Sequence, residues 1–106
     1  MESRSGVGTA KILCVELDFS VLESRCSVLK NSGYDAASAS PQVADIVLRR
    51  QRFDLIVISS LTDYDLHRIL NLSDGADILV LEPLTAPSEL LSLVAQRLDL
   101  NRQLKA

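Results

Sequence analysis

The sequence predicts an α/β domain in which a parallel sheet forms the middle layer of a three-layer sandwich. Three continuous apolar runs, rich in β-branched residues, are the expected central strands, at 12–15, 55–58 and 78–81. Such runs suit strands that are buried on both faces of a parallel sheet. A more polar run over 34–39 fits an edge strand. A helical pattern follows each run, so we expect four βα units joined by right-handed crossovers.

The first two helices are expected where apolar spacing and cap residues coincide. The first spans about 19–31, and Gly33 just past its end is a candidate C-cap. Its buried stripe is expected to consist of Leu22, Cys26 and Leu29. The second helix opens at Ser40 and Pro41, a cap residue followed by proline at the first helical position.

The last two helices are predicted in the same way. One begins near Thr62, where Thr62 and Asp65 have the spacing of a capping box, with aspartate as a short stand-in for glutamate. The other runs from about Pro87. Its expected buried stripe is Leu91, Val94 and Leu98.

The chain length fits one compact domain of 106 residues. We expect residues 1–10, which are small and polar, to form a flexible leader, and residues 11–106 to form a single domain. Apolar residues make up 47% of the chain, enough for a core. The Gly-Val-Gly at 6–8 precedes the first strand, whereas a phosphate-binding glycine loop follows a strand and opens a helix.

Charge and cysteine content argue against several classes of protein. The net charge of −3 disfavours a nucleic-acid surface, and the basic cluster at 49–52 falls at a helix end. No apolar run approaches the about 18 residues of a membrane span, and the N-terminus lacks a secretory signal. We therefore expect a cytoplasmic protein without a membrane partner, in which Cys14 and Cys26 stay reduced. His67, the single histidine, is expected on a helix surface.

Several stretches, in order along the chain, resemble the receiver domain of bacterial two-component response regulators. They are KILCVELDFSVL (11–22), LKNSGYD (29–35), RFDLIVIS (52–59), GAD (75–77), LEPL (81–84) and SELL (88–91). The likeness covers nearly all of 11–98. It implies a flavodoxin-like fold and a place in phosphorelay signal transduction.

The resemblance also implies a chemical site that this sequence does not complete. In the family, an aspartate after strand three accepts a phosphoryl group, a carboxylate pair holds Mg²⁺, and a lysine before a proline pairs with the product charge. Here the acceptor position is Ser59, which cannot form an acyl phosphate, and we expect no adjacent base to activate it. The carboxylate pair becomes Glu16 and Leu17, with Asp18 as partial compensation. Glu82 replaces the lysine and would repel a phosphoryl group.

These changes predict a domain with no catalytic residue, no metal ion and no cofactor, and hence not an enzyme. The leading hypothesis is a pseudo-receiver that binds partner proteins independently of phosphorylation. One alternative is an atypical phospho-acceptor that uses Asp18, Asp63 or Asp65. A second is a small flavodoxin-like nucleotide or flavin binder, which the acidic segment after the first strand disfavours. A third is a trimmed or designed receiver.

The chain is also short for a receiver, which has five βα units. One strand and one helix between Ser59 and Glu82 are missing. The GAD signature suggests that 77–82 is the family's fifth strand, joined directly after the third helix. A competing alignment makes this segment the fourth strand, with Glu82 at the position of the switch threonine. We favour the first alignment.

The loss of a unit predicts an exposed apolar surface, which normally marks a partner. The last helix carries a second stripe of Leu93, Leu100 and Leu104, expected to face outward, at spacings of seven and four residues. These spacings fit a helix–helix seam, although scattered surface leucines are the alternative. We therefore expect a homodimer that pairs through a twofold axis.

Overall fold

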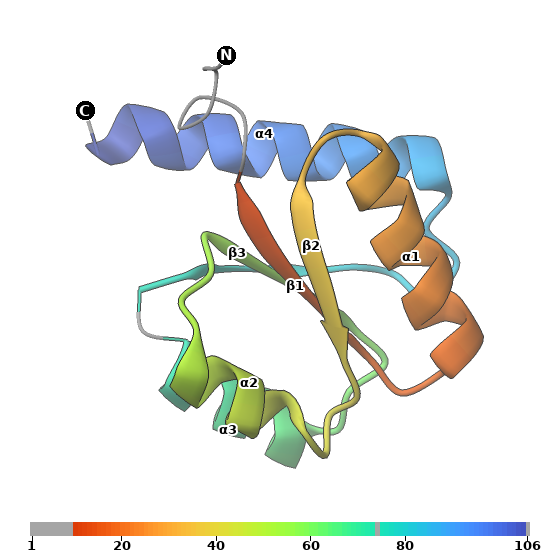
Figure 1. The fold of residues 1–106 in the computed structure, drawn as a ribbon, viewed down its shortest axis with the longest axis vertical. Coiled ribbons are helices and arrows are strands. Elements are labelled where there is room, and N and C mark those ends of the chain that lie inside the picture. Colours follow the sequence, from red (N-terminus) through yellow and green to blue (C-terminus); the bar gives the residue numbers. More distant parts are fainter. Residues whose placement is uncertain (1–9, 74, 106) are drawn as a thin grey trace.

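Four parallel strands form the central layer of the described part of the chain, and four helices flank it (Figure 1). The computed structural model describes residues 10–73 and 75–105, with side chains through residue 100. The strands are β1 (Lys11–Glu16), β2 (Asp35–Ala39), β3 (Leu55–Ser59) and β4 (Asp77–Val80). The helices are α1 (Phe19–Asn31), α2 (Ala44–Arg50), α3 (Asp63–Leu72) and α4 (Pro87–Lys105). The predicted sandwich of βα units is confirmed.

The sheet order is β2-β1-β3-β4, and each neighbouring pair is parallel. The two central strands, β1 and β3, are buried along almost their whole length. This burial explains their continuous apolar runs, because helices cover both of their faces. The more polar β2 lies at one edge, as its sequence predicted.

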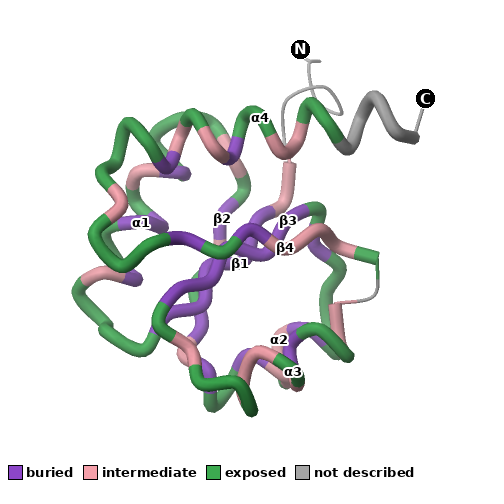
Figure 2. Tube along the Cα trace, turned by 180° about the vertical axis from the view of Figure 1, so that it is seen from behind, coloured by how far each residue is buried: buried purple, intermediate pink, exposed green. Residues whose placement is uncertain are grey.

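Two apolar clusters hold the layers together, one on each face of the sheet. The cluster under α1 and α4 includes Ile12, Leu29, Val57, Leu90 and Val94. The cluster under α2 and α3 includes Leu13, Leu48, Ile56, Ile58 and Ile69. Figure 2 shows the buried strands between the two helix pairs. Successive side chains of a strand point to opposite faces of the sheet, so neighbouring residues of β1 and β3 belong to different clusters.

In the described part of the chain, the sheet has four strands where a complete receiver has five, and β4 forms one of its edges. This strand lies beside β3, the place of the fourth strand in the 2-1-3-4-5 order of complete flavodoxin-like sheets. Both alignments place this strand beside β3, so the strand order agrees with either of them. On the α2 and α3 face, the side chain of Val80 is 63% exposed, so the loss of the unit uncovers this corner of the sheet.

The helix ends test the predicted caps. Asp18 caps α1 by accepting hydrogen bonds from the amides of Ser20 and Val21, and Thr62 caps α3 through the amide of Asp65. Gly33 has a φ of +97° after α1, the left-handed conformation that favours glycine. No helix in the described segments is long and apolar enough to cross a bilayer.

The predicted start of α2 is wrong. The helix begins at Ala44, three residues beyond Pro41, and its N-cap Val43 makes no side-chain cap bond. Residues 41–43 form a turn in which the carbonyl of Ser40, not its hydroxyl, accepts from the amides of Val43 and Ala44. Pro41 is buried and its carbonyl accepts a hydrogen bond from Arg68, so tertiary contact fixes this turn.

Candidate functional site

The carboxyl ends of β1 and β3 bring the two central site residues side by side. Glu16 and Ser59 are register partners at the last position of their strands. Their side chains are buried, with 4% and 1% of their surfaces exposed. The Ser59 hydroxyl donates a hydrogen bond to Glu16 Oε1. The expectation that Ser59 has no adjacent base is therefore wrong, because the Glu16 carboxylate accepts a hydrogen bond from its hydroxyl.

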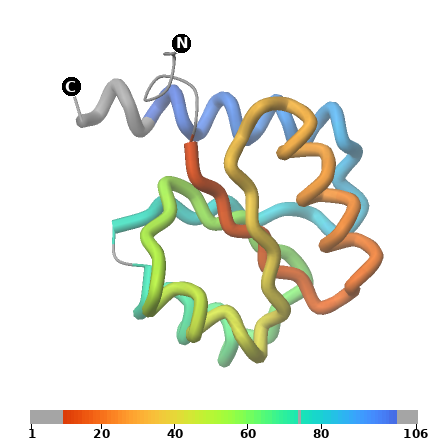
Figure 3. Tube along the Cα trace, in the orientation of Figure 1, coloured from red at the N-terminus to blue at the C-terminus, as the bar shows by residue number. Residues whose placement is uncertain are grey.

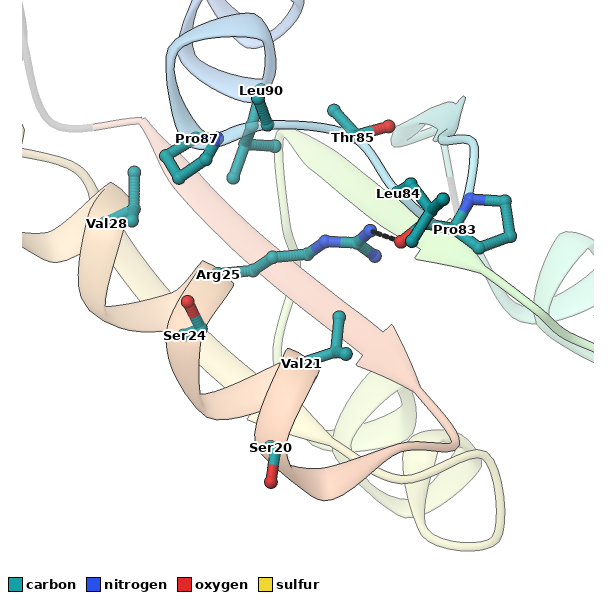
Figure 4. A pocket seen from close by; sticks show the side chains of 11 residues that line it. Ser20, Val21, Ser24, Arg25, Val28, Pro83, Leu84, Thr85, Pro87 and Leu90 are labelled. Carbon is teal, nitrogen blue, oxygen red and sulfur yellow. Dashed lines mark hydrogen bonds between the residues drawn. The ribbon is translucent and has the colours of Figure 1, made fainter.

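A third residue, Arg25 of α1, completes this buried cluster. Its guanidinium Nη1 lies 3.2 Å from Glu16 Oε1 and also donates to Ser59 Oγ. Its Nη2 donates to the carbonyls of Glu82, at 3.4 Å, and Pro83, at 3.3 Å. Figure 4 shows the side chain reaching from α1 to the segment after β4. Arg25 is only 6% exposed, so one buried cation joins the ends of three strands.

The sequence analysis did not identify Arg25, although its sequence position carries a signal. Arg25 stands three residues after Leu22 and four before Leu29, on the predicted apolar stripe of α1. A cation on such a stripe requires a buried partner, because an unpaired buried charge is very costly. This reasoning could have predicted a carboxylate partner at the end of a strand.

The other carboxylates of this edge do not enter the cluster. Asp18 caps α1 with its side chain, and its amide donates to Glu16 Oε2 at 3.1 Å. The Glu82 side chain is exposed, and only its backbone carbonyl reaches Arg25. Asp63 is exposed in the first turn of α3, and Asp65 pairs with Arg68 at 3.1 Å. The carboxylates considered as alternative acceptors thus have structural roles or lie on the surface.

The cluster does not fit the Mg²⁺ ion that the family resemblance implies. Mg²⁺ needs several oxygen ligands in near-octahedral geometry. Both oxygens of Glu16 already accept hydrogen bonds, and the guanidinium of Arg25 holds the positive charge. Within residues 10–73 and 75–100, no three side chains of the histidine, cysteine, aspartate and glutamate types converge as metal ligands would. The arrangement compensates the charge of Glu16 with a side chain.

Cys14 lies on β1, two residues before Glu16, in the cluster under α1 and α4. Burial raises the pKa of its thiol to about 12, and the nearby Cys26 adds to this effect, whereas Arg25 opposes it. Both cysteines are free thiols and buried. The thiolate form of Cys14 is therefore strongly disfavoured in the folded protein.

A pocket of about 440 Å³ lies beside the cluster, between α1 and the segment that leads from β4 into α4 (Figure 4). Figure 3 shows these two segments running side by side. Val21, Val28 and Leu90 give the pocket apolar walls, and Arg25 lines it as well. Leu84 also lines it and is 95% exposed. At the same sheet edge, Leu17 after β1 and Phe19 at the start of α1 are 60% and 71% exposed.

The predicted seam on the last helix is only partly present. Leu93 is half-buried and packs against the cluster under α1 and α4, so its outward placement was wrong. The reason is that α4 lies across the sheet and turns Leu91, Leu93 and Leu98 toward the core. Leu100 is 49% exposed, as predicted. The side chain of Leu104 lies outside the described residues.

The strand order, the helix layers and the buried strand-end cluster define a flavodoxin-like fold of the receiver type. Among solved structures, the chain is similar to a CheY-like response regulator receiver domain protein of Methanospirillum hungatei, with a TM-score of 0.64 and 18% identity. This match covers 90% of the present chain and 98% of that protein. The chemotaxis response regulator CheY4 of Vibrio cholerae matches with a TM-score of 0.70, 20% identity, and coverage of 85% and 98%.

A second structure of Vibrio cholerae CheY4, crystallised at pH 4.0, gives a TM-score of 0.60 at 18% identity, with coverage of 83% and 98%. No protein-family model matches the chain, and a search of curated proteins finds no match. At these identities the likeness establishes the fold. Function must therefore be argued from the site itself.

Proposed function

We propose that the chain is a pseudo-receiver, a cytoplasmic signalling domain that acts through protein–protein contacts and does not depend on phosphorylation. Two lines of reasoning support the proposal. The fold is that of response regulator receivers, and the residues at the positions for phosphoryl transfer cannot perform it. The fold supports a role in signalling, and the site residues support action without phosphorylation.

The observation that carries the proposal is the position of Arg25. In a receiver, the positive charges that stabilise the phosphoryl group are a metal ion and a lysine. In this chain the buried guanidinium compensates Glu16 permanently, through a side chain that is part of the fold. No incoming anion is needed to balance the site, and Glu82 in place of the lysine adds negative charge at its rim. The site therefore has one stable state, which suits a constitutive module.

Ser59 is a poor phosphoryl acceptor despite its contact with Glu16. The hydroxyl is 1% exposed, and both Glu16 and Arg25 contact it. In-line attack on a phosphoryl donor needs an open path and a cation on the transferred oxygens. Arg25 could offer a cation only by leaving Glu16 unpaired in a buried place.

The surface of the same sheet edge supports a protein partner. Large apolar side chains are exposed here: Leu84 lines the pocket, Leu17 follows β1, and Phe19 is the first residue of α1. Leu17 stands at the position of one of the family's metal-binding carboxylates. Apolar groups gathered at one edge are typical of a protein-binding surface.

The direct test is chemical phosphorylation. We expect incubation with acetyl phosphate or beryllofluoride and Mg²⁺ to leave the mass and the NMR spectrum unchanged, while a receiver with an intact aspartate responds under the same conditions. The variant Ser59→Asp, which restores an acceptor carboxylate, should also fail to respond, because Arg25 remains in the site. A stoichiometric phosphate adduct on the wild-type chain would overturn the proposal.

We also propose that a second copy of the chain is one of its partners. Among the seam residues whose side chains the structure describes, Leu100 on α4 is exposed. Twofold pairing is the commonest solution for such a contact. Sedimentation at micromolar concentration should give a homodimer, and a stable monomer would refute this part of the proposal.

A further inference from the structure

The open edge of the sheet presents a physical problem that the proposed function does not address. In the described part of the chain, β4 pairs with β3 alone. A fifth strand lies beyond the fourth in complete sheets of this type. An edge strand without a neighbour offers N–H and C=O groups to which another chain can pair, and such edges lead to aggregation unless they are blocked.

The hydrogen bonds of β4 identify which of its groups face the open edge. The amides of Asp77 and Leu81 donate to the carbonyls of Asp54, at 3.3 Å, and Ile58, at 2.8 Å, on the side of β3. Backbone groups of successive residues in a strand point to opposite sides. The amide and carbonyl groups of Ile78 and Val80 therefore point away from β3.

Side chains bond both outward groups of Ile78. The carboxylate of Asp77 accepts from the Ile78 amide at 2.9 Å through Oδ1. Arg97 of α4 donates from Nη1 to the Ile78 carbonyl at 2.6 Å. The same Nη1 lies 3.1 Å from Asp77 Oδ2, so the two side chains form an ion pair. This pair makes the same two hydrogen bonds that a neighbouring strand would make.

The segment after β4 also has few free backbone groups with which a second strand could pair. The carbonyl of Glu82 accepts from the amide of Thr85 at 3.1 Å, from its hydroxyl at 2.7 Å, and from Arg25 at 3.4 Å. Pro83 has no amide hydrogen. Val80 is therefore the position of this edge at which a new strand could form its usual pair of bonds, and one pair cannot hold two sheets together.

We propose that the Asp77–Arg97 pair guards the sheet edge and prevents β4 from pairing with β4 of a second copy. It also directs any homodimer toward other surfaces, such as the end of α4. The inference stands apart from the proposed function, since it concerns the sheet edge and not the strand-end cluster.

The test is the double variant Asp77→Ala/Arg97→Ala. It should sediment at a higher mean mass than the wild type at the same concentration. At dilution, hydrogen exchange of the Ile78 amide should be about fivefold faster, the factor that corresponds to one lost hydrogen bond. Arg97→Leu, which keeps the aliphatic stem and frees only the carbonyl, should show a smaller rise in mass.

Two further variants separate edge pairing from general loss of stability. Arg68→Ala breaks an ion pair of similar exposure between α2 and α3, away from the edge, and should keep the wild-type mass. Val80→Pro in the double variant removes the outward amide of Val80 and puts a proline ring on the open edge, and should return the mass to the wild-type value. The proposal fails if the double variant and Arg97→Leu keep the wild-type mass, or if Val80→Pro does not reverse the association.

Discussion

At the scale of single residues, the buried ion pair of Arg25 and Glu16 decides what the strand-end cluster can do. Taking two charges out of water is costly, and their mutual attraction with extra hydrogen bonds offsets this cost. Ser59 and the carbonyls of Glu82 and Pro83 supply those hydrogen bonds. The pair therefore adds little net stability. Its main effect is to fix the position of α1 relative to the segment after β4.

This view predicts an asymmetric response to substitution. Arg25→Met should lower the free energy of unfolding by about 3–5 kcal/mol, because it leaves Glu16 buried without a counter-charge. Glu16→Gln in the same chain should restore much of that loss, as measured by urea unfolding. Arg49→Met, at an exposed position near the end of α2, is the control and should change stability by at most about 0.5 kcal/mol. A loss below about 1 kcal/mol in Arg25→Met would show that the cluster is solvated.

The Cys14 thiol predicts a specific pH dependence. Its pKa is raised to about 12 in the folded state by burial, from an ordinary value of 9.0. The folded protein thus keeps a proton that the unfolded chain releases, so this contribution is complete below about pH 9 and is lost as the pH rises toward 12. Between about pH 9 and 12, the free energy of unfolding should decrease less steeply with pH in Cys14→Val than in the wild type. The two slopes should differ by up to about 1.4 kcal/mol per pH unit. Identical slopes in both proteins would contradict the assignment.

At the scale of elements, the cap of α1 gives Asp18 a structural role at the end of β1. Asp18 follows the strand where the family places metal ligands, yet its carboxylate accepts from two amides of the first helical turn. A capping side chain needs an acceptor oxygen but not a full negative charge. Substitutions of Asp18 can therefore distinguish its role as a helix cap from a role as a metal ligand.

We expect Asp18→Asn to keep nearly the wild-type stability, since asparagine caps about as well as aspartate. Asp18→Ala should cost about 1 kcal/mol. Thermal and urea unfolding of the two variants provide the measurement. If the wild type is stabilised by Mg²⁺ and Asp18→Asn abolishes that effect, the carboxylate is a ligand and the capping account is incomplete.

The helix starts also show the limit of local sequence signals. Thr62 caps α3 as its spacing predicted, because the bond it makes lies within one turn of the chain. Ser40 has an equally good local sequence, but Pro41 is buried and bonded to Arg68 of α3. Contact between α3 and the turn at Pro41, which are distant in sequence, accompanies the later start of α2 at Ala44.

At the scale of the whole molecule, the two leucines of α4 should respond differently to charge. Leu93→Glu places a carboxylate against the core cluster and should destabilise the fold by roughly 2–5 kcal/mol. Leu100→Glu, at an exposed position, should leave the free energy of unfolding nearly unchanged and shift the proposed homodimer toward monomer. Sedimentation together with denaturant unfolding distinguishes the two effects. A stable wild-type monomer that Leu100→Glu does not alter would leave this leucine without a role in association.

The absence of a fifth βα unit uncovers little of the sheet. Each face of the sheet still has a helix pair with its own apolar cluster. Within the described strands, the exposed large apolar side chain is that of Val80, beside the open edge of β4. One ion pair can protect such an edge, so a shortened domain can remain folded without a partner strand.

The sequence by itself determined the type of fold, because apolar runs, helical spacing and Gly33 act within a few residues of the chain. It also predicted Ser59, Glu16 and Glu82 as the positions that depart from the phosphoryl-transfer site of receivers. Only the tertiary structure decided that Arg25 fills the site, that Leu93 faces the core, and that Asp77 and Arg97 close the edge of β4. These outcomes depend on which side chains meet from elements far apart in the chain, and a local pattern such as the apolar stripe around Arg25 can call for a partner but cannot identify it.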